Sequence, residues 1–220
     1  MLCNAMRTTN AGFTLIEIMV ALVLAAILLG IATPSFSEFV RNARIASAAN
    51  GVLAAMHAAR TEAIKRRVPV TVCASSNPTS DSPTCDPDGD FSGWILFVDD
   101  DGDPVDSSGK EGNGKFEPGE GTGDEILLRT SDRPQEGLDV LPSTGYVQFG
   151  ANGFQRRDMD AAPNDVDILI CDSRGSRSLG SSGTAARLLQ VTRTGRPQIT
   201  RDETTVKAAI ATLGKCPADA

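Results

Sequence analysis

Histidine and aromatic residues are scarce in this chain of 220 residues. It has one histidine, one tryptophan, one tyrosine and eight phenylalanines, against 21 glycines and 12 prolines. A catalytic or metal-binding role for His57 has no second histidine to support it, so we expect it to be an ordinary surface or groove residue. No glycine-rich phosphate loop follows an apolar strand-like run, and no Cys/His cluster has zinc-site spacing. We therefore expect a small aliphatic core rich in turns, in a protein that is not an enzyme.

Acidic residues are concentrated in one part of the sequence. Residues 81–125 contain fourteen acidic residues and two lysines, out of 28 acidic and 21 basic residues in the whole chain. The rest of the chain is mildly basic, although the net charge is −7. The negative net charge of the whole chain therefore does not exclude a polyanionic partner, which could bind the basic part.

The acidic part contains a candidate calcium loop at residues 99–120. Alternating carboxylates in a glycine-rich loop supply the hard oxygen ligands that calcium prefers. An EF-hand loop that begins at Asp99 needs glycine where Pro104 stands and glutamate where Lys110 stands. We favour a solvated acidic loop over calcium, and we expect no cofactor and no metal.

One long apolar run lies close to the N-terminus. From residue 13 to residue 33 it contains a single charged residue, Glu17, and as a helix it is long enough to cross a bilayer. The insertion free energy of its apolar side chains outweighs the cost of one acid, about 3 kcal/mol. A secretory signal peptide fits poorly, because the run is long and no small-x-small cleavage site is followed by a soluble start. We predict a transmembrane helix over residues 13–33.

The helical pattern continues beyond the apolar run. Small and apolar residues recur at helical spacing through residues 34–67, with arginines among them, which predicts an amphipathic helix there. The whole helix, from Phe13 to about Arg66, would be roughly 80 Å long. Its second half is expected to support a head domain formed by residues 68–220.

The head has the pattern of a β-rich domain. Short β-branched and aromatic runs alternate with clusters of glycine, proline, aspartate and serine, and no internal repeat or long linker separates them. We expect an α+β fold, in which the amphipathic helix packs against an antiparallel sheet around one core. The predicted strands are residues 69–73, 94–98, 126–129, 146–149, 166–171 and 187–191.

The segment from Gly12 to Glu17, which reads GFTLIE, resembles the processing motif of type IV prepilins and type II secretion pseudopilins. The resemblance implies that a prepilin peptidase cuts after Gly12 and that Phe13 becomes the methylated N-terminus. Residues 1–12, with Cys3, would then be a leader. It also implies that Glu17 acts in fibre assembly. A buried acid in a membrane helix needs a partner, and the free amine of Phe13, on the same or a neighbouring subunit, supplies one.

Removal of the leader would leave an even number of cysteines. Four are then available for disulfides in an oxidising compartment, and the sequence permits three pairings. Sequential pairing is the most economical, and the shorter loop would contribute roughly 3 kcal/mol of stability. The four are Cys73, Cys85, Cys171 and Cys216.

Later segments resemble, in order, the GspH/FimT family of minor pilins and pseudopilins. They are residues 70–73 with Cys85, residues 93–99, residues 171–175 and residues 194–197. The pairing of Cys171 with a cysteine near the C-terminus looks like FimU. The resemblance implies a single-pass inner-membrane protein with a periplasmic head, incorporated near the tip of a type IV pilus or a type II secretion pseudopilus. Its partners would be other pilins or pseudopilins, the prepilin peptidase and a secreted cargo or DNA. The choice between the two systems stays open.

An arginine-bearing segment near the C-terminus raises DNA binding as the alternative function. FimT-type minor pilins use arginines after a glycine in this place to capture DNA during natural transformation. Here Gln198 and Thr200 stand where further arginines would be expected, two acidic residues follow, and no aromatic residue accompanies the segment for base stacking. We therefore favour the fibre-subunit function. The candidate DNA-binding residues are Arg193, Arg196 and Arg201.

Overall fold

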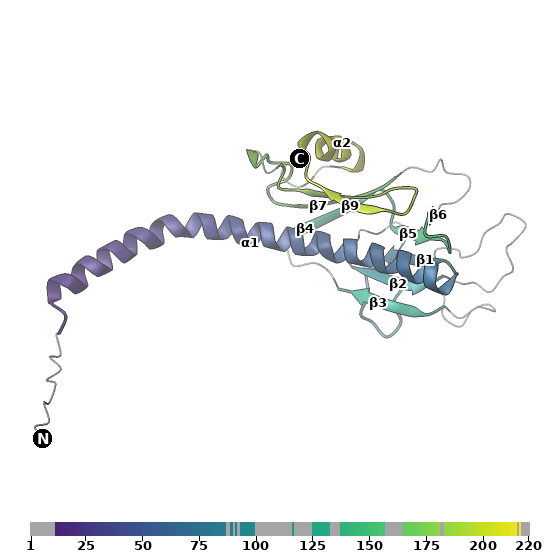
Figure 1. The fold of residues 1–220 in the computed structure, drawn as a ribbon, viewed down its shortest axis with the longest axis horizontal. Coiled ribbons are helices and arrows are strands. Elements are labelled where there is room, and N and C mark those ends of the chain that lie inside the picture. The colour runs from purple at the N-terminus through teal and green to yellow at the C-terminus, as the bar shows by residue number, and fades with distance from the viewer. Residues whose placement is uncertain are drawn as a thin grey trace, which may run out of the picture. The chain divides into compact units, whose positions relative to one another are not determined.

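The computed structural model describes residues 12–86, 89, 91, 93–99, 116, 125–132, 137–156, 165–180, 183–214 and 216. The chain divides into two compact units, residues 1–41 and residues 42–220 (Figure 1). The elements are α1 (Leu15–Arg66), β1 (Val70–Ala74), β2 (Trp94–Val98), β3 (Leu127–Ser131), β4 (Leu138–Pro142), β5 (Tyr146–Phe149), β6 (Gln155–Arg156), β7 (Val166–Asp172), β8 (Arg187–Val191), β9 (Pro197–Thr200) and α2 (Glu203–Leu213).

The predicted long helix is present as α1, which begins two residues later than expected. Thr14 caps its N-terminus, because the Thr14 hydroxyl oxygen accepts a hydrogen bond from the Glu17 backbone N–H at 3.3 Å. At the other end Arg67 adopts a φ of 62°, and its N–H donates to the carbonyl oxygen of Ala63. This left-handed residue and the proline that follows at position 69 end the helix.

The N-terminal unit leaves its apolar side chains uncovered by the rest of that unit. Large apolar residues between Phe13 and Leu29 are 51% to 80% exposed. Within the part of the chain that the structure describes, no helix is both long and apolar enough to qualify as a membrane span. The predicted span over residues 13–33 includes residues 31–33, whose side chains are outside the described set. The transmembrane helix therefore stays a prediction.

The described strands form two antiparallel sheets, whereas the sequence led us to expect one. The first, sheet A, has the order β3-β2-β1-β5-β6, and the second, sheet B, has the order β4-β7-β8-β9. The predicted strands are all present, with bounds that differ by at most two residues. The unpredicted strands are β4, β6 and β9, which are short and contain charged residues or proline. They supply both edge strands of sheet B and one edge of sheet A.

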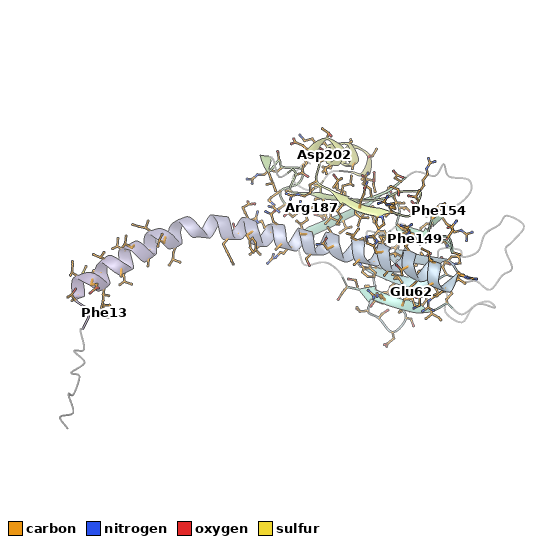
Figure 2. All side chains as sticks on the ribbon, in the orientation of Figure 1. Phe13, Glu62, Phe149, Phe154, Arg187 and Asp202 are labelled. Atoms are coloured by element: carbon orange, nitrogen blue, oxygen red, sulfur yellow. A yellow bond between two sulfur atoms is a disulfide. The ribbon has the colours of Figure 1, made fainter. Side chains whose placement is uncertain are left out.

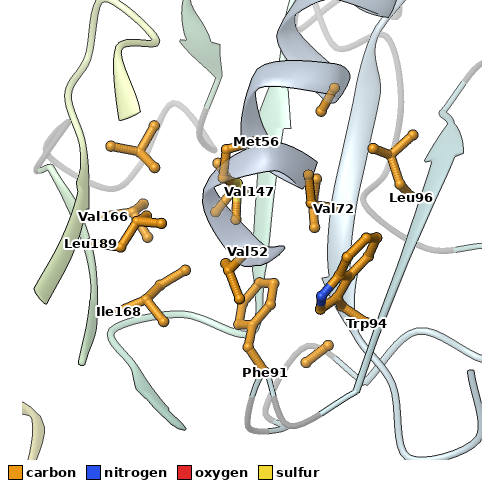
Figure 3. Close-up of a cluster of buried hydrophobic side chains, with 14 of the residues drawn as sticks. Val52, Met56, Val72, Phe91, Trp94, Leu96, Val147, Val166, Ile168 and Leu189 are labelled. Atoms are coloured by element: carbon orange, nitrogen blue, oxygen red, sulfur yellow. The ribbon is translucent and has the colours of Figure 1, made fainter. Parts of the chain in front are cut away.

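The second half of α1 packs against both sheets around one apolar core. Figure 3 shows Val52 and Met56 of α1 with Val166, Ile168 and Leu189 of sheet B on one side and Val72 and Leu96 of sheet A on the other. The buried residues of α1 recur mostly every three or four positions, so they form a single helical stripe. They are Ile45, Ala49, Val52, Ala55, Met56, Ala59 and Ala63.

The helix α2, which the sequence did not predict, lies on the opposite face of sheet B. Val206 and Ala209 of α2 form a buried cluster with Leu169 and Leu188. Asp202 caps this helix, since its Oδ1 accepts hydrogen bonds from the Thr205 N–H at 2.9 Å and the Thr204 hydroxyl at 2.6 Å. Hydrogen bonds from Thr204 and Thr205 lower the pKa of Asp202 to about 2. The carboxylate therefore stays charged and keeps capping α2 down to low pH.

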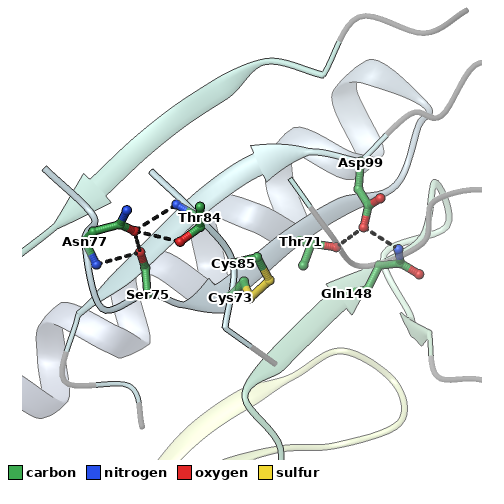
Figure 4. The surroundings of a disulfide bond; sticks show 8 residues. All are labelled: Thr71, Cys73, Ser75, Asn77, Thr84, Cys85, Asp99 and Gln148. Atoms are coloured by element: carbon green, nitrogen blue, oxygen red, sulfur yellow. Dashed lines mark hydrogen bonds between the residues drawn. A yellow bond between two sulfur atoms is a disulfide. The ribbon is translucent and has the colours of Figure 1, made fainter. Parts of the chain in front are cut away.

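Two disulfides tie later segments of the chain to inner strands of the two sheets, and they join the cysteines in sequential pairs. Cys73 is bonded to Cys85 with a Cα–Cα distance of 5.6 Å, and Cys171 to Cys216 with 6.2 Å. The first closes the loop after β1 against the outer face of sheet A (Figure 4). The second ties the segment that follows α2 to β7, so α2 is covalently held on sheet B.

Candidate functional site

The predicted processing segment leads directly into α1. Gly12 and Phe13 precede the helix, and Phe13 is 80% exposed. Glu17 is exposed in the first turn, three residues after the capping residue Thr14. An acid in the first turn is favourable beside the helix N-terminus, and Thr14 and Glu17 have the spacing of a capping box. Gly12 and Phe13 are thus both exposed beside the start of α1, where Figure 2 shows Phe13.

The candidate DNA-binding arginines do not all lie at one place. Arg193 and Arg196 are exposed in the turn that joins β8 to β9. Arg201 follows the other end of β9, and its carbonyl oxygen accepts a hydrogen bond from the Thr184 N–H at 3.0 Å. Strand β9 therefore separates Arg201 from the other two, and only Arg193 and Arg196 belong to the surface at the turn.

That surface includes an aromatic residue which the sequence did not associate with it. The Gln155 N–H donates to the Arg193 carbonyl oxygen at 3.1 Å, which places the β5–β6 hairpin beside the β8–β9 turn. Phe154, the residue before Gln155, is 51% exposed. We call Arg60, Phe154, Arg156, Arg193 and Arg196 the hairpin surface.

Close backbone contact holds the parts of the hairpin surface together. A Cβ atom at Gly195, whose φ is 71°, would collide with the carbonyl oxygen of Gly153. Gly153 in turn lies against the Ile64 and Arg60 side chains of α1. The close approach of two glycines from distant segments explains how both hairpins and α1 meet, and sequence spacing gives no signal of it.

The candidate calcium loop lies outside the described residues except for Asp99 and Phe116. Asp99 is fully buried, and its Oδ2 accepts hydrogen bonds from the Thr71 hydroxyl at 2.5 Å and from Gln148 Nε2 at 2.8 Å (Figure 4). Among the described residues, no group of three or more His, Cys, Asp or Glu side chains is arranged to hold a metal ion. Asp99 thus joins β1, β2 and β5 on the outer face of sheet A.

The single histidine is part of an open groove between α1 and sheet A. His57 is exposed and lines this groove, about 380 Å³ in volume, together with Thr61, Leu96 and Arg129. A nucleophilic triad with His57 would need a cysteine or serine and a carboxylate nearby. Among the described residues that line the groove there is no cysteine or serine, and the one carboxylate is Glu62. Glu62 is engaged by Arg66, whose Nε donates to it at 2.7 Å and lowers its pKa.

The chain combines a processing motif with a long N-terminal helix and a disulfide-bonded β-sheet head. These features define the class of pilin-like subunits. Such subunits are structural components of fibres and are not known enzymes. The comparisons narrow that class. Residues 7–33 match the prokaryotic N-terminal methylation motif, and residues 48–195 match the family described as type II transport protein GspH. The chain belongs to the GspH family, whose members are minor pilins and pseudopilins of type IV pili or type II secretion systems.

Two solved structures are similar to this chain. Both are crystal forms of the type IV minor pilin FimU from Pseudomonas aeruginosa. The first has 19% sequence identity and a TM-score of 0.46, and the match covers 74% of this chain and 92% of FimU. The second has 20% identity and a TM-score of 0.42, covering 70% and 90%. No curated protein matches the chain significantly.

Proposed function

We propose that this protein is cleaved after Gly12, methylated at Phe13 and held in the inner membrane by a single span, with its head in the periplasm. From there it is incorporated near the tip of a type IV pilus or a type II secretion pseudopilus. Its partners are the prepilin peptidase during maturation and other pilins or pseudopilins in the fibre. In a secretion system it would also meet the secreted cargo.

The uncovered apolar surface at the start of α1 carries this proposal. Large apolar residues from Phe13 to Leu29 are at least half exposed within their unit, with Glu17 among them as an acid. Such a surface needs a bilayer or neighbouring apolar helices to cover it. Lipid would cover these side chains while the subunit is in the membrane, and the neighbouring helices of the fibre core would cover them after assembly. In both surroundings Glu17 is stabilised by the amine of Phe13.

Maturation of the N-terminus can be measured directly. Protein recovered from cell envelopes should begin with methylated Phe13, as read by N-terminal sequencing and intact mass. The Gly12→Leu variant should keep residues 1–12, because the bulky side chain replaces the glycine at the cleaved bond. A wild-type chain that retains Met1, or one cleaved inside the apolar run, would contradict the proposal.

Glu17→Gln separates cleavage from assembly in the same experiment. We expect this variant to be processed but to enter sheared fibres at least about tenfold less, since the loss of a charge pair worth about 1.4 kcal/mol changes an equilibrium tenfold. Glu62→Gln, on the same helix and paired only with Lys65 and Arg66 of that helix among the described residues, is the matched control and should assemble normally. Equal incorporation of the two variants would rule out the assembly role of Glu17.

DNA capture is the second candidate function, and the presence of Phe154 on the hairpin surface favours it. Arginines from the β8–β9 turn can contact phosphates, and an exposed aromatic ring can stack on a base of a single strand. The hydrogen bond from Gln155 to Arg193 and the contact between Gly153 and Gly195 hold these groups at one surface. This binding would serve DNA uptake during natural transformation.

A binding assay on the full chain in detergent tests the second candidate. We expect fluorescence anisotropy with single-stranded DNA to show affinity that falls steeply with salt. Replacing Arg193 and Arg196 with alanine should lower the slope of log K against log salt by about 1.4, roughly 0.7 for each lost phosphate contact on a single strand. Phe154→Ala should weaken binding with the slope unchanged. Arg129→Ala, on exposed β3, is the control. Absent or salt-insensitive binding would leave only the fibre-subunit function.

A further inference from the structure

Three arginines lie at one end of the inner face of sheet B, the apolar face that packs against α1. Along this face Ile168 of β7, Leu189 of β8 and Ile199 of β9 lie side by side in register, covered by α1. One step further along the strands, Arg187 is paired with Ile170. Because Leu188 is paired with Thr200, the residue opposite Arg187 on the other side is Arg201. Since side chains two positions apart share a face, Arg187 and Arg201 continue the apolar rows.

Arg187 is a buried cation. The residue is only 6% exposed, and its Nη1 donates to the carbonyl oxygens of Thr184, Ala185 and Ala186 at 3.0, 2.8 and 3.1 Å. Burial, together with the guanidinium groups of Arg201 and Arg174, lowers the pKa of Arg187 to about 10. Carbonyl oxygens satisfy hydrogen bonds but carry no full charge, so the positive charge of Arg187 remains uncompensated by them.

Arg174 is the third cation at this end of the sheet, and it is paired with Asp172. Its Nη2 donates to Asp172 Oδ2 at 2.7 Å, and its Nη1 donates to Asn42 Oδ1 of α1 at 2.9 Å. Both Arg174 and Asp172 are 6% exposed. This charge pair lies where α1 enters the head unit, at Asn42.

The acids that follow Arg201 are also engaged elsewhere. Asp202 caps α2, and Glu203 accepts a hydrogen bond from Lys207 Nζ at 2.7 Å. Arg201 Nε is itself buried, and within the described part of the chain it has no hydrogen-bond partner. Neither Arg187 nor Arg201 forms an ion pair with a described carboxylate. The cluster of Arg174, Arg187 and Arg201 therefore has an excess of two positive charges over Asp172.

We propose that Arg174, Arg187 and Arg201 form a binding site for a phosphate group at this end of sheet B. Guanidinium groups donate in planar pairs that match phosphate oxygens, and a buried charge is stable only when it is compensated. A phosphate monoester carries about −1.5 to −2 at neutral pH, which matches the excess, whereas one carboxylate would leave a positive charge behind. The phosphate group comes either from free inorganic phosphate or from the monoester headgroup of phosphatidic acid, because the phosphodiester of other phospholipids carries only one negative charge.

Stability in the presence of inorganic phosphate tests the site. The full chain is kept in a maltoside detergent, which has no phosphate, and its unfolding is followed by the fluorescence of Trp94, the one tryptophan. The midpoint temperature should rise by about 5 to 10 °C when phosphate is about 100-fold above its Kd. Calorimetric titration of the same wild-type chain gives that Kd without any variant.

Arg201→Gln is the test variant, because the Arg201 side chain has a buried Nε without a partner, and its removal breaks no hydrogen bond that holds the fold. The rise caused by phosphate should shrink by at least half in this variant. Arg129→Gln, on exposed β3 of sheet A, should keep the full rise and so corrects for the general stabilising effect of phosphate salts. An equal rise in wild type and Arg201→Gln, or no heat of binding in the wild type, would overturn the proposal.

Reconstitution into nanodiscs distinguishes the two sources of phosphate. If lipid headgroups occupy the site, the chain in discs that contain phosphatidic acid should have the raised midpoint already, and added phosphate should change it little. If the natural ligand is free phosphate, the rise on adding phosphate should be as large in the discs as in detergent. Either result supports the site and names its source. Arg201→Gln must reduce the stabilisation in both settings.

Discussion

Replacing Arg174 with leucine should lower the free energy of unfolding by about 3 to 5 kcal/mol, because it leaves a buried carboxylate without its cation. Arg174 Nε lies 3.1 Å from Asp172 Oδ1 and 3.0 Å from Oδ2, and the Arg174 backbone N–H also donates to this carboxylate. The side chain also donates a hydrogen bond to Asn42, so its loss removes this link between sheet B and α1.

Urea unfolding of the full chain in detergent, followed by Trp94 fluorescence, measures this effect. Arg129→Leu is the control, since Arg129 is an exposed arginine of β3, and its effect should stay below about 0.5 kcal/mol. Adding Asp172→Asn to Arg174→Leu should recover part of the loss, because the buried negative charge is removed. A loss below about 1 kcal/mol for Arg174→Leu would show that the pair is not needed for stability.

The same pair gives a physical reason for one of the sequence motifs. Residues 171–175 resembled the family in sequence alone, and the structure shows what the segment does. Cys171 is bonded to Cys216 on one face of sheet B, and Asp172 points to the other face, where it binds Arg174. Gly175 adopts a φ of 55°, which the turn needs to bring Arg174 back towards Asp172. The motif therefore fastens α2 and α1 to opposite faces of one strand.

The elements with strong periodic patterns were the predictable ones. Small and apolar residues at helical spacing over residues 34–67 predicted the long helix, and the runs of β2 and β8 were apolar enough to be recognised as strands. The motif around Gly12, Phe13 and Glu17 was recognised because it is local in the sequence, and the roles of these three residues stay predictions. These features depend on neighbouring residues only, so no knowledge of tertiary contacts was needed.

The parts that escaped prediction depend on contacts between distant segments. Strand β9 reads PQIT, and it is a strand because it pairs with β8 and not because of its own pattern. The helix α2 is held by a cap at Asp202 and by the Cys171–Cys216 bond, which override the low helix propensity of its threonines. Phe154 lies beside Arg193 and Arg196 because the β5–β6 hairpin and the β8–β9 turn come together at Gly153 and Gly195, a contact that the sequence does not indicate.

Two isoleucines on α1 allow a matched test of where the head core begins. Ile45 is fully buried in the core cluster, whereas Ile64 is 48% exposed. Ile45→Ala should lower the free energy of unfolding by about 2 to 5 kcal/mol, because the lost methyl groups leave a cavity between the helix and the sheets. Both substitutions improve helix propensity by the same few tenths of a kcal/mol, so that contribution cancels in the comparison.

Ile64→Ala should cost less than about 1 kcal/mol, because a half-exposed side chain loses little buried area. The two variants are compared by urea unfolding with Trp94 fluorescence in the same detergent. Ile45 lies three residues after Asn42, where the Arg174 side chain binds α1. A large effect at Ile45 would therefore mean that α1 is packed firmly on the sheets from the turn that contains Asn42 and Ile45 onward. Equal small effects would mean that this turn is loose, and that the Arg174–Asn42 bond does not hold it.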